Sequence, residues 1–360
     1  MGKPMGKLLA ALAGASVVWL ASCRPAPPPP PPTMAAVVEA SGANSSMIDR
    51  AAQFRRDIVA ASVRTGVVLD ARAMAFYVRQ PEKLAARCRL LGFADVYLAV
   101  SDPARIGEQA ATLTALLREL HRAGMQCYAA LDLNYLYGYD NSVTLNPFAD
   151  GLAARAVAPV VGFNTAWGRA ADERFDGIEA ILLPYRQSAG VSGRSAPLYR
   201  WNEDEWGRNS ENSTLIRETL DLMRQIRGKA AALTVVQNIG ADFHDRTLAD
   251  QLARGGVNNF LDFCDVVIID NVSNRPEEIL RRITPELRDA VGKASVAVRI
   301  ITSQDFYGEQ AARHSFSRKP WRKLVAELHG VCRKAGAYPS FRGLVFDDFL
   351  GLEACWERTR

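Results

Sequence analysis

The sequence of 360 residues is poor in the residues and motifs that bind metals and nucleotides. It has only four histidines, and no two of its six cysteines have the Cys-x-x-Cys spacing of a metal or redox site. No Gly-x-Gly-x-x-Gly turn, phosphate-binding loop or Gly-x-Ser-x-Gly motif is present. Asp242, His244 and Asp245 alone are too few for a zinc site, which needs clustered ligands. We therefore expect neither a metal nor a cofactor.

The chain also lacks a strong excess of basic or acidic residues. The chain has 44 basic and 39 acidic residues, which gives a formal net charge of +5, and the basic residues are scattered along it. Nucleic-acid-binding proteins carry a strong basic excess that is clustered on one face or along one helix. We therefore expect no nucleic-acid partner.

No apolar run reaches the roughly 20 residues that a spanning helix needs, which disfavours the alternative of an uncleaved membrane helix at the amino terminus. The amino terminus instead has a basic start, a shorter apolar run over residues 8–20, and then Leu20-Ala21-Ser22-Cys23. This pattern resembles a bacterial lipoprotein signal peptide over residues 1–22, whose final motif precedes the cysteine that is acylated. The resemblance implies a palmitate-type lipid anchor at Cys23. It also implies a location in the bacterial cell envelope, on the periplasmic or outer-membrane face.

The segment after Cys23 is rich in proline. Residues 24–33 favour an extended polyproline rod, which acts as a semi-rigid spacer of about 3 Å per residue. The composition stays rich in Ala, Ser and Pro up to Ser46. We therefore predict a lipidated linker over residues 23–46 and a single folded domain over residues 47–360.

Five cysteines remain once Cys23 is assigned to the lipid. An odd number in an exported protein means that at least one thiol is free. Cys332 and Cys355 are the pair that we predict to be bridged. An equally good interpretation is that the cysteines are small buried apolar residues.

Eight strand-like segments alternate with helical ones from Thr65 onward. The predicted strands are residues 66–72, 94–101, 126–133, 174–185, 233–239, 265–272, 295–302 and 342–349. The main predicted helices are residues 81–92, 106–123, 213–229, 276–291 and 321–335. This alternation is typical of an α/β fold of the (β/α)8 TIM-barrel type. An open doubly wound sheet is the alternative, and the lack of a glycine-rich turn after the first strand disfavours it.

The fourth predicted strand, residues 174–185, contains an acid where one is costly. It is apolar on both alternating sets of residues, which predicts helices or other chain on both faces. Glu179 lies in its middle. Burying a lone carboxylate costs several kcal/mol unless it is paired or protonated, so we expect Glu179 to be functional.

Polar residues recur at the carboxyl ends of the predicted strands, where the active site of a barrel lies. They are Asp70, Arg72, Asp132, Asn134, Glu179, Gln237, Asn238, Asp270, Asn271, Arg299, Asp347 and Asp348. Any single acid at such a place is more often a solvated residue or a helix cap than a catalyst. Their recurrence at one edge is what predicts a site.

The loops at this edge are aromatic. They contain Tyr135, Tyr137, Tyr139, Tyr185, Tyr199, Trp201 and Trp206, and His244 follows the fifth strand. Flat rings with polar tips suit the C–H faces of sugars, and carboxylates and amides suit sugar hydroxyls. These features predict a polysaccharide or oligosaccharide partner. The alternative is that the rings only pack the loops against the barrel.

Three stretches resemble the glycosidase-like (β/α)8 families of bacterial secreted proteins. They are LHRAGMQCYAALDLN, FDGIEAILLPY and FRGLVFDDF, at residues 120–134, 175–185 and 341–349. In these families the fourth strand carries Asp-Gly-Ile-x-x-Asp, and its last acid is catalytic. Here Ile181 holds that position, two residues beyond Glu179 and on the same side of the strand. Either Glu179 has taken over the role, or the barrel has lost activity and only binds.

The resemblance implies a glycoside hydrolase, which needs two carboxyl groups with separated pKa values. We predict Glu179 as the general acid, because burial raises a carboxyl pKa, with Asp270 or Asp347 and then Asp132 as the ionised partner. Asp347 is preferred to Asp348 because of its inward parity. The predicted substrate-binding residues are Asp70, Arg72, Asn134, Tyr135, Tyr137, Tyr185, Trp201, Trp206, Asn238, His244, Arg299 and Asp348. A catalytically inactive glycan-binding lipoprotein of the envelope is the alternative, and a purely structural envelope protein is the third hypothesis.

Overall fold

The computed structural model describes residues 30–100, 103–133, 151–181, 210–240, 257–271, 273–304 and 313–358. The chain divides into two compact units, Met1–Pro31 and Pro32–Arg360. The second unit contains all the helices and strands discussed below.

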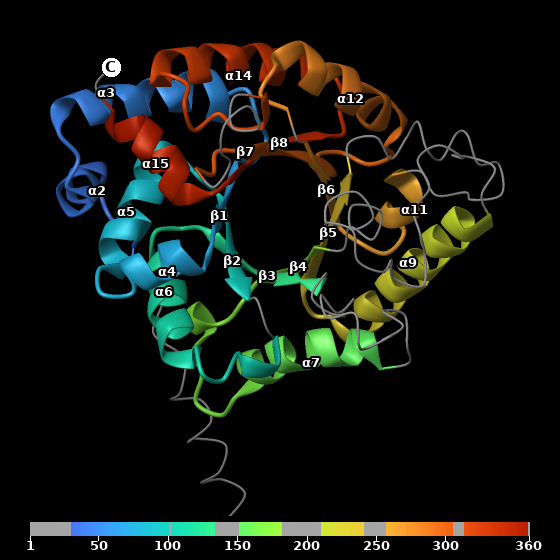
Figure 1. Cartoon of the computed structure of the whole chain (residues 1–360). Helices are drawn as coiled ribbons and strands as arrows, with labels where there is room; N and C mark the ends of the chain where they lie inside the picture. Colours follow the sequence, from blue (N-terminus) through green and yellow to red (C-terminus); the bar gives the residue numbers. More distant parts are fainter. Residues whose placement is uncertain are drawn as a thin grey trace, which may run out of the picture. The chain divides into compact units, whose positions relative to one another are not determined.

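Eight parallel strands form a closed barrel in which every strand pairs with its neighbours in sequence, and β8 pairs with β1 (Figure 1). The strands are β1 (Gly66–Leu69), β2 (Asp95–Val100), β3 (Gln126–Asp132), β4 (Gly177–Ile181), β5 (Thr234–Gly240), β6 (Val266–Asp270), β7 (Val296–Ile301) and β8 (Phe341–Asp347). The (β/α)8 fold predicted from the alternation of the sequence is therefore confirmed.

Helices surround the barrel (Figure 1). They are α2 (Met34–Ser41), α3 (Ser45–Phe54), α4 (Ala71–Tyr77), α5 (Pro81–Leu91), α6 (Ala110–Arg122), α7 (Leu152–Thr165), α9 (Ser210–Lys229), α11 (Val257–Leu261), α12 (Pro276–Asp289), α14 (Trp321–Ala335) and α15 (Phe349–Glu357). The ends of α5 illustrate how the local sequence determines where a helix begins and ends. Pro81 occupies its first turn, where a missing N–H costs nothing, and Gly92 ends it with a left-handed φ of 87°.

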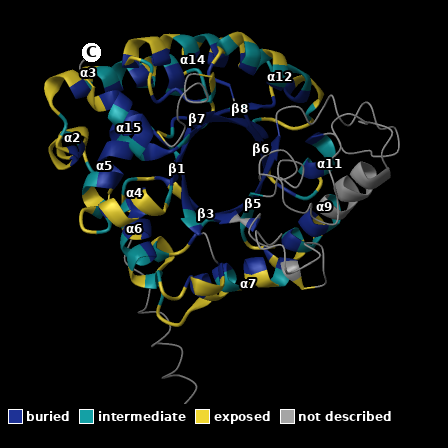
Figure 2. Cartoon of the chain, viewed as in Figure 1, coloured by how far each residue is buried: buried dark blue, intermediate teal, exposed yellow. Residues whose placement is uncertain are grey.

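The barrel has an apolar core on each side of its wall, and most residues of its strands are buried (Figure 2). The larger cluster lies between strands and helices. The smaller one fills the barrel interior with Val68, Tyr97, Tyr128, Ala130, Val236, Val266, Ile268, Ala297 and Val345, and Ile181 packs against it. Since alternate residues of a strand share a face, this cluster identifies which residues point toward the barrel axis.

The folded unit begins before residue 47, so the prediction that residues 34–46 belong to the linker is wrong. Helices α2 and α3 occupy this segment, and Asn44 caps α3 by accepting the Met47 N–H at 3.0 Å. Val37 is buried, and Arg87 of α5 donates to the Ser41 carbonyl at 3.0 Å. A composition rich in Ala and Ser permits a helix once another helix covers its apolar residues.

The strand ends also differ from the prediction. The first predicted strand, residues 66–72, stops at Leu69, and Asp70 caps the helix α4 that follows directly. The last predicted strand, residues 342–349, stops at Asp347, and Asp348 caps α15. In both places a short polar side chain satisfies the first N–H groups of a helix, a strong local signal that outweighs strand propensity.

The five cysteines in the described residues are all buried and free. The predicted Cys332–Cys355 bridge is therefore wrong for this structure. The Cys355 thiol instead donates to the Ser317 carbonyl at 3.3 Å, and Cys332 lies 3.9 Å from the Ser62 hydroxyl. Burial raises the pKa of the Cys332 thiol to about 12, so these residues behave as small apolar groups.

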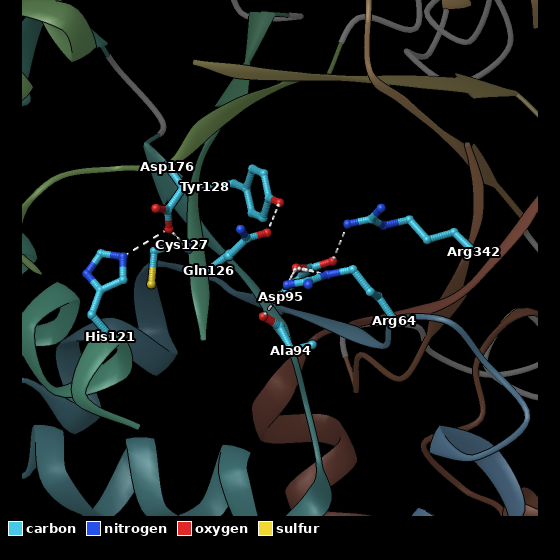
Figure 3. A network of polar contacts seen from close by, with 9 residues as sticks. All are labelled: Arg64, Ala94, Asp95, His121, Gln126, Cys127, Tyr128, Asp176 and Arg342. Carbon is cyan, nitrogen blue, oxygen red and sulfur yellow. Dashed lines mark hydrogen bonds and ion pairs between the residues drawn. The ribbon is translucent and has the colours of Figure 1, made fainter. Parts of the chain in front are cut away.

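A polar network occupies the amino-terminal end of the barrel (Figure 3). Asp95 accepts from Arg64 through one carboxylate oxygen, at 2.9 and 2.6 Å, and from Arg342 through the other at 3.0 Å. Beside it, Tyr128 donates to Gln126 at 3.0 Å. The Asp95 contacts join β2 and β8 to the chain that enters β1, whereas the Tyr128–Gln126 contact lies within β3.

Candidate functional site

Five inward-facing polar residues line the carboxyl-terminal half of the barrel. Four of them lie two residues beyond an apolar residue of the interior cluster, and the fifth, Glu179, lies two residues before Ile181. They are Glu179 of β4, Asn238 of β5, Asp270 of β6, Arg299 of β7 and Asp347 of β8. The strand parity that the sequence predicts therefore brings five of the predicted site residues into one interior.

Arg299 connects this group. Its guanidinium forms an ion pair with the Glu179 carboxylate and donates to Asp347 Oδ2 at 3.3 Å. Asn238 Nδ2 lies 3.4 Å from the same Glu179 oxygen. The side chain of Glu179 has no exposed surface, whereas that of Asp347 is 33% exposed. One arginine thus spans from the sealed interior to the barrel mouth.

Glu179 experiences opposing electrostatic effects. Burial has the largest effect and raises its pKa, the positive charge of Arg299 and the Asn238 hydrogen bond lower it, and the charges of Asp347 and Asp270 raise it again, so that the pKa stays above its ordinary value. Burial would also lower the pKa of Arg299, yet its neighbouring carboxylates hold that pKa above its ordinary value. Because an arginine stays charged, it needs a counter-ion in this setting, and Glu179 supplies one.

Asp347 lies at the mouth. Burial raises the pKa of its carboxyl group, the charges of Asp270 and Asp70 raise it further, and Arg299 opposes both effects. The result is a raised pKa on a side chain that solvent reaches. Such a carboxyl group retains its proton at a higher pH than an ordinary aspartic acid, which is the property of a proton donor.

Several buried polar atoms at this end have no hydrogen-bond partner within the described part of the chain. They are Glu179 Oε2, Gln237 Oε1, Asn238 Oδ1, Asn271 Oδ1 and Arg299 Nε. Leaving such an atom unpaired costs about 1–3 kcal/mol. Donors and acceptors that protein does not satisfy are available to water or to a ligand.

Asp70 and Asp348, which the sequence predicts as substrate-binding residues, act as helix caps. Asp70 accepts the Ala73 N–H at 2.7 Å through one oxygen and Arg72 at 2.8 Å through the other. Asp348 accepts the N–H of Gly351, and Arg72 reaches it at 3.3 Å. The Asp70–Arg72–Asp348 chain thus ties the starts of α4 and α15 together beside the mouth.

Other predicted residues are not described by the structure. Asp132 ends β3, and its side chain lies outside what the structure describes. Asn134, Tyr135, Tyr137, Tyr185, Trp201, Trp206, His244 and Cys23 lie outside the described residues. Their roles stay predictions.

The joint contact of Arg299 with Glu179 and Asp347 is the feature that sequence reasoning missed. A signal for it was present. Arg299 stands in the apolar strand VAVRII, just as Glu179 stands in GIEAI. Two opposite charges in two buried strands predict a pair, because a buried charge is retained only with a partner.

Within the described ranges, no group of three or more His, Cys, Asp or Glu residues could hold a metal ion. Among those same residues, no helix is both long enough and apolar enough to cross a membrane.

The fold and the site define a closed (β/α)8 barrel with acids and one arginine facing its interior toward the carboxyl ends of the strands. The sequence matches no family model and no curated protein.

Similar solved structures include a glycoside hydrolase domain, a chitinase and a mannanase. The glycoside hydrolase domain of PgaB (BpsB) from Bordetella bronchiseptica is 14% identical, with a TM-score of 0.48 over 82% of this chain and 97% of that one. A chitinase from Chromobacterium violaceum is 12% identical, with a TM-score of 0.45 over 82% and 100%. A modular endo-β-1,4-mannanase from Cellulomonas fimi is 12% identical, with a TM-score of 0.46 over 89% and 76%. These likenesses concern the course of the chain, so the chemistry must be argued from the site.

Proposed function

We propose that this protein is a glycoside hydrolase that cleaves a cell-envelope or extracellular polysaccharide at the carboxyl-terminal mouth of its barrel. One observation carries the proposal. Asp347 is a solvent-reachable carboxyl group whose pKa is raised by burial and by neighbouring acids, and Arg299 fixes its position. No cofactor is needed for this chemistry, since two carboxyl groups perform it.

The two catalytic roles fall on Asp347 and Asp270. Asp347 donates a proton to the oxygen of the leaving sugar, because its raised pKa keeps that proton available. Asp270 ends the nearby strand β6 and is 6% exposed. Its charge acts on Asp347, which places it within electrostatic reach. It serves as the ionised partner, either as nucleophile or as the base that activates water.

Glu179 takes a positioning role in this proposal rather than the general-acid role that the sequence predicts. Its side chain has no exposed surface and its carboxylate is ion-paired with Arg299, so a substrate at the mouth does not reach it. It fixes Arg299, which in turn holds Asp347.

A second candidate is a glycan-binding protein without catalysis, and Ile181 favours it. Ile181 stands where the resembling families have their catalytic acid, and it packs against the apolar interior of the barrel. In either case we propose that a lipid on Cys23 attaches the protein to the bacterial cell envelope.

The test compares the full chain with Asp347→Asn on a panel of bacterial and plant polysaccharides. The proposal expects the wild type to release reducing ends and Asp347→Asn to release almost none, with its melting temperature unchanged. Asp348→Asn is the matched control, because asparagine also caps a helix and this neighbour points elsewhere. Binding without cleavage by the wild type would establish the second candidate instead.

A further inference from the structure

Three exposed apolar side chains mark the end of the barrel opposite the mouth. Val63, Trp167 and Val291 are 62%, 103% and 66% exposed. Val63 precedes β1, Trp167 lies between α7 and β4, and Val291 lies between α12 and β7. In a parallel barrel, the loops that lead into strands all lie at the amino-terminal end. The three side chains therefore belong to one face.

Their distribution favours a flat partner. The strands follow one another around the closed ring from β1 to β8, so β1, β4 and β7 are separated by three, three and two steps. The three tips consequently surround the barrel axis instead of lining one groove. Three points around a rim define a plane, and a planar partner can touch all of them at once.

Trp167 is presented by a fixed loop. The guanidinium of Arg169 lies 3.6 Å from the centre of the Phe163 ring and donates to the Thr114 hydroxyl at 2.7 Å. Arg174 donates to the Arg169 carbonyl at 2.8 Å. These contacts hold the loop and leave the indole in solvent. Indole has an apolar body and one N–H donor, a combination suited to the boundary between lipid and water.

Positive charge lies beside these tips. Lys293 and Arg174 are both exposed and have no ion-pair partner among the described residues, whereas Glu173 is paired with Arg118. The exposed acids close to the tips in sequence are Asp172, near Trp167, and Asp289, near Val291, which is ion-paired with Arg288. Cationic side chains next to exposed apolar ones suit a surface of anionic lipid headgroups.

We propose that the amino-terminal face of the barrel rests on a lipid bilayer that contains anionic headgroups, with Trp167, Val63 and Val291 entering the headgroup region. The proline-rich residues 24–33 precede the folded unit. At about 3 Å per residue, ten extended residues reach roughly 30 Å, so a lipid on Cys23 would tether the folded unit close to a membrane. The barrel mouth then opens away from the lipid. This inference is independent of the hydrolase chemistry.

The test uses the full chain reconstituted in vesicles of phosphatidylethanolamine and phosphatidylglycerol with brominated acyl chains. The difference in fluorescence between the wild type and Trp167→Phe isolates the emission of Trp167. We expect this emission to shift to the blue, to be largely quenched by the brominated lipid and to resist aqueous acrylamide. Combining Val63→Ser with Val291→Ser should restore most of the emission.

Phe76→Ser is the matched control, because Phe76 is 59% exposed on α4 at the other end of the barrel and should leave the Trp167 signal unchanged. Vesicles of phosphatidylcholine alone, or high salt, should weaken the quenching. Free access of acrylamide to Trp167, failure of the chain to bind vesicles, or a response of Trp167 to soluble glycan in place of lipid would overturn the proposal.

Discussion

The two ends of the barrel differ in how completely their buried carboxylates are hydrogen-bonded. At the amino-terminal end, both oxygens of the Asp95 carboxylate accept hydrogen bonds from arginines, although Arg342 Nε has no partner among the described residues (Figure 3). At the carboxyl-terminal end, the Arg299 guanidinium forms ion pairs with both Glu179 and Asp347, and one Glu179 oxygen has no partner among the described residues. A carboxylate whose oxygens are all hydrogen-bonded within the protein stabilises the fold, whereas one with an unpaired oxygen leaves an acceptor for water or a ligand.

Asp347→Asn, at the carboxyl-terminal end, is the substitution from which we expect the largest effect. Removing a general acid should lower kcat by about 10²–10⁴-fold, since that is the usual contribution of positioned proton transfer. Stability should change little, because Asp347 is partly exposed and amide oxygen can still accept from Arg299. Steady-state kinetics on a cleaved oligosaccharide would measure the loss. An unchanged kcat would remove Asp347 from the mechanism.

Glu179→Gln should act mainly on folding. It removes the buried counter-ion of Arg299 and leaves only the longer contact with Asp347, which costs about 3–5 kcal/mol of unfolding free energy. Urea denaturation followed by circular dichroism would measure this loss. The matched variant combines Glu179→Gln with Arg299→Met, which removes the stranded charge and should recover much of the stability. Equal instability of the single and double variants would contradict the assignment of Glu179 as counter-ion.

Asp95→Asn tests the amino-terminal end. It removes the charge shared by Arg64 and Arg342 and should cost about 2 kcal/mol of unfolding free energy, because charge-assisted hydrogen bonds are weakened. The kcat of the folded fraction should stay at the wild-type value, since this network lies away from the mouth. A loss of kcat similar to that of Asp347→Asn would abolish the distinction between the two ends.

The pH dependence of activity should come from the carboxyl-terminal end. The raised pKa of Asp347 means that the proton donor is present below that pKa and is lost as the pH rises through it. We therefore expect kcat to decline on the alkaline side, with a midpoint above the ordinary value for aspartic acid. A pH–rate profile of the wild type against Asp348→Asn checks this, and the two profiles should coincide.

The smallest effect concerns stability near neutral pH at the amino-terminal end. Burial alone would lower the pKa of His121, but its hydrogen bonds to the Asp176 side chain and the Asp172 carbonyl raise it above the ordinary value. The stabilisation is complete below the pKa of the unfolded state and is lost as the pH rises through the folded pKa. Melting curves of His121→Gln should lack this dependence, with a difference below about 1 kcal/mol.

The sequence predicts the barrel well because each strand and helix carries its own signal. The helix predicted over residues 321–335 matches α14, and α5 begins at the predicted Pro81. The prediction fails for α2, whose residues have no strong helical pattern alone and depend on packing against α5. It also extends β1 and β8 into residues that cap helices, because a strand pattern does not show where capping begins.

The sequence also predicts part of the site, because the alternation of side chains along a strand is a local property. Strand parity alone places Asp347 inside and Asp348 outside, and both placements are seen in the contacts that each makes. Parity does not show how deeply a residue is buried or which charged residue forms an ion pair with it. Glu179 therefore looked like an isolated acid in the sequence, whereas the structure supplies Arg299 from a strand 120 residues away.

The sequence by itself determined the (β/α)8 fold and the set of polar residues at the strand ends, because the period of apolar residues and the strand alternation are local properties. Only the tertiary structure decided which of these acids is a counter-ion, which is a helix cap and which reaches solvent. Those roles depend on the distance to charges and on exposure, and both are created when strands distant in sequence close into one ring.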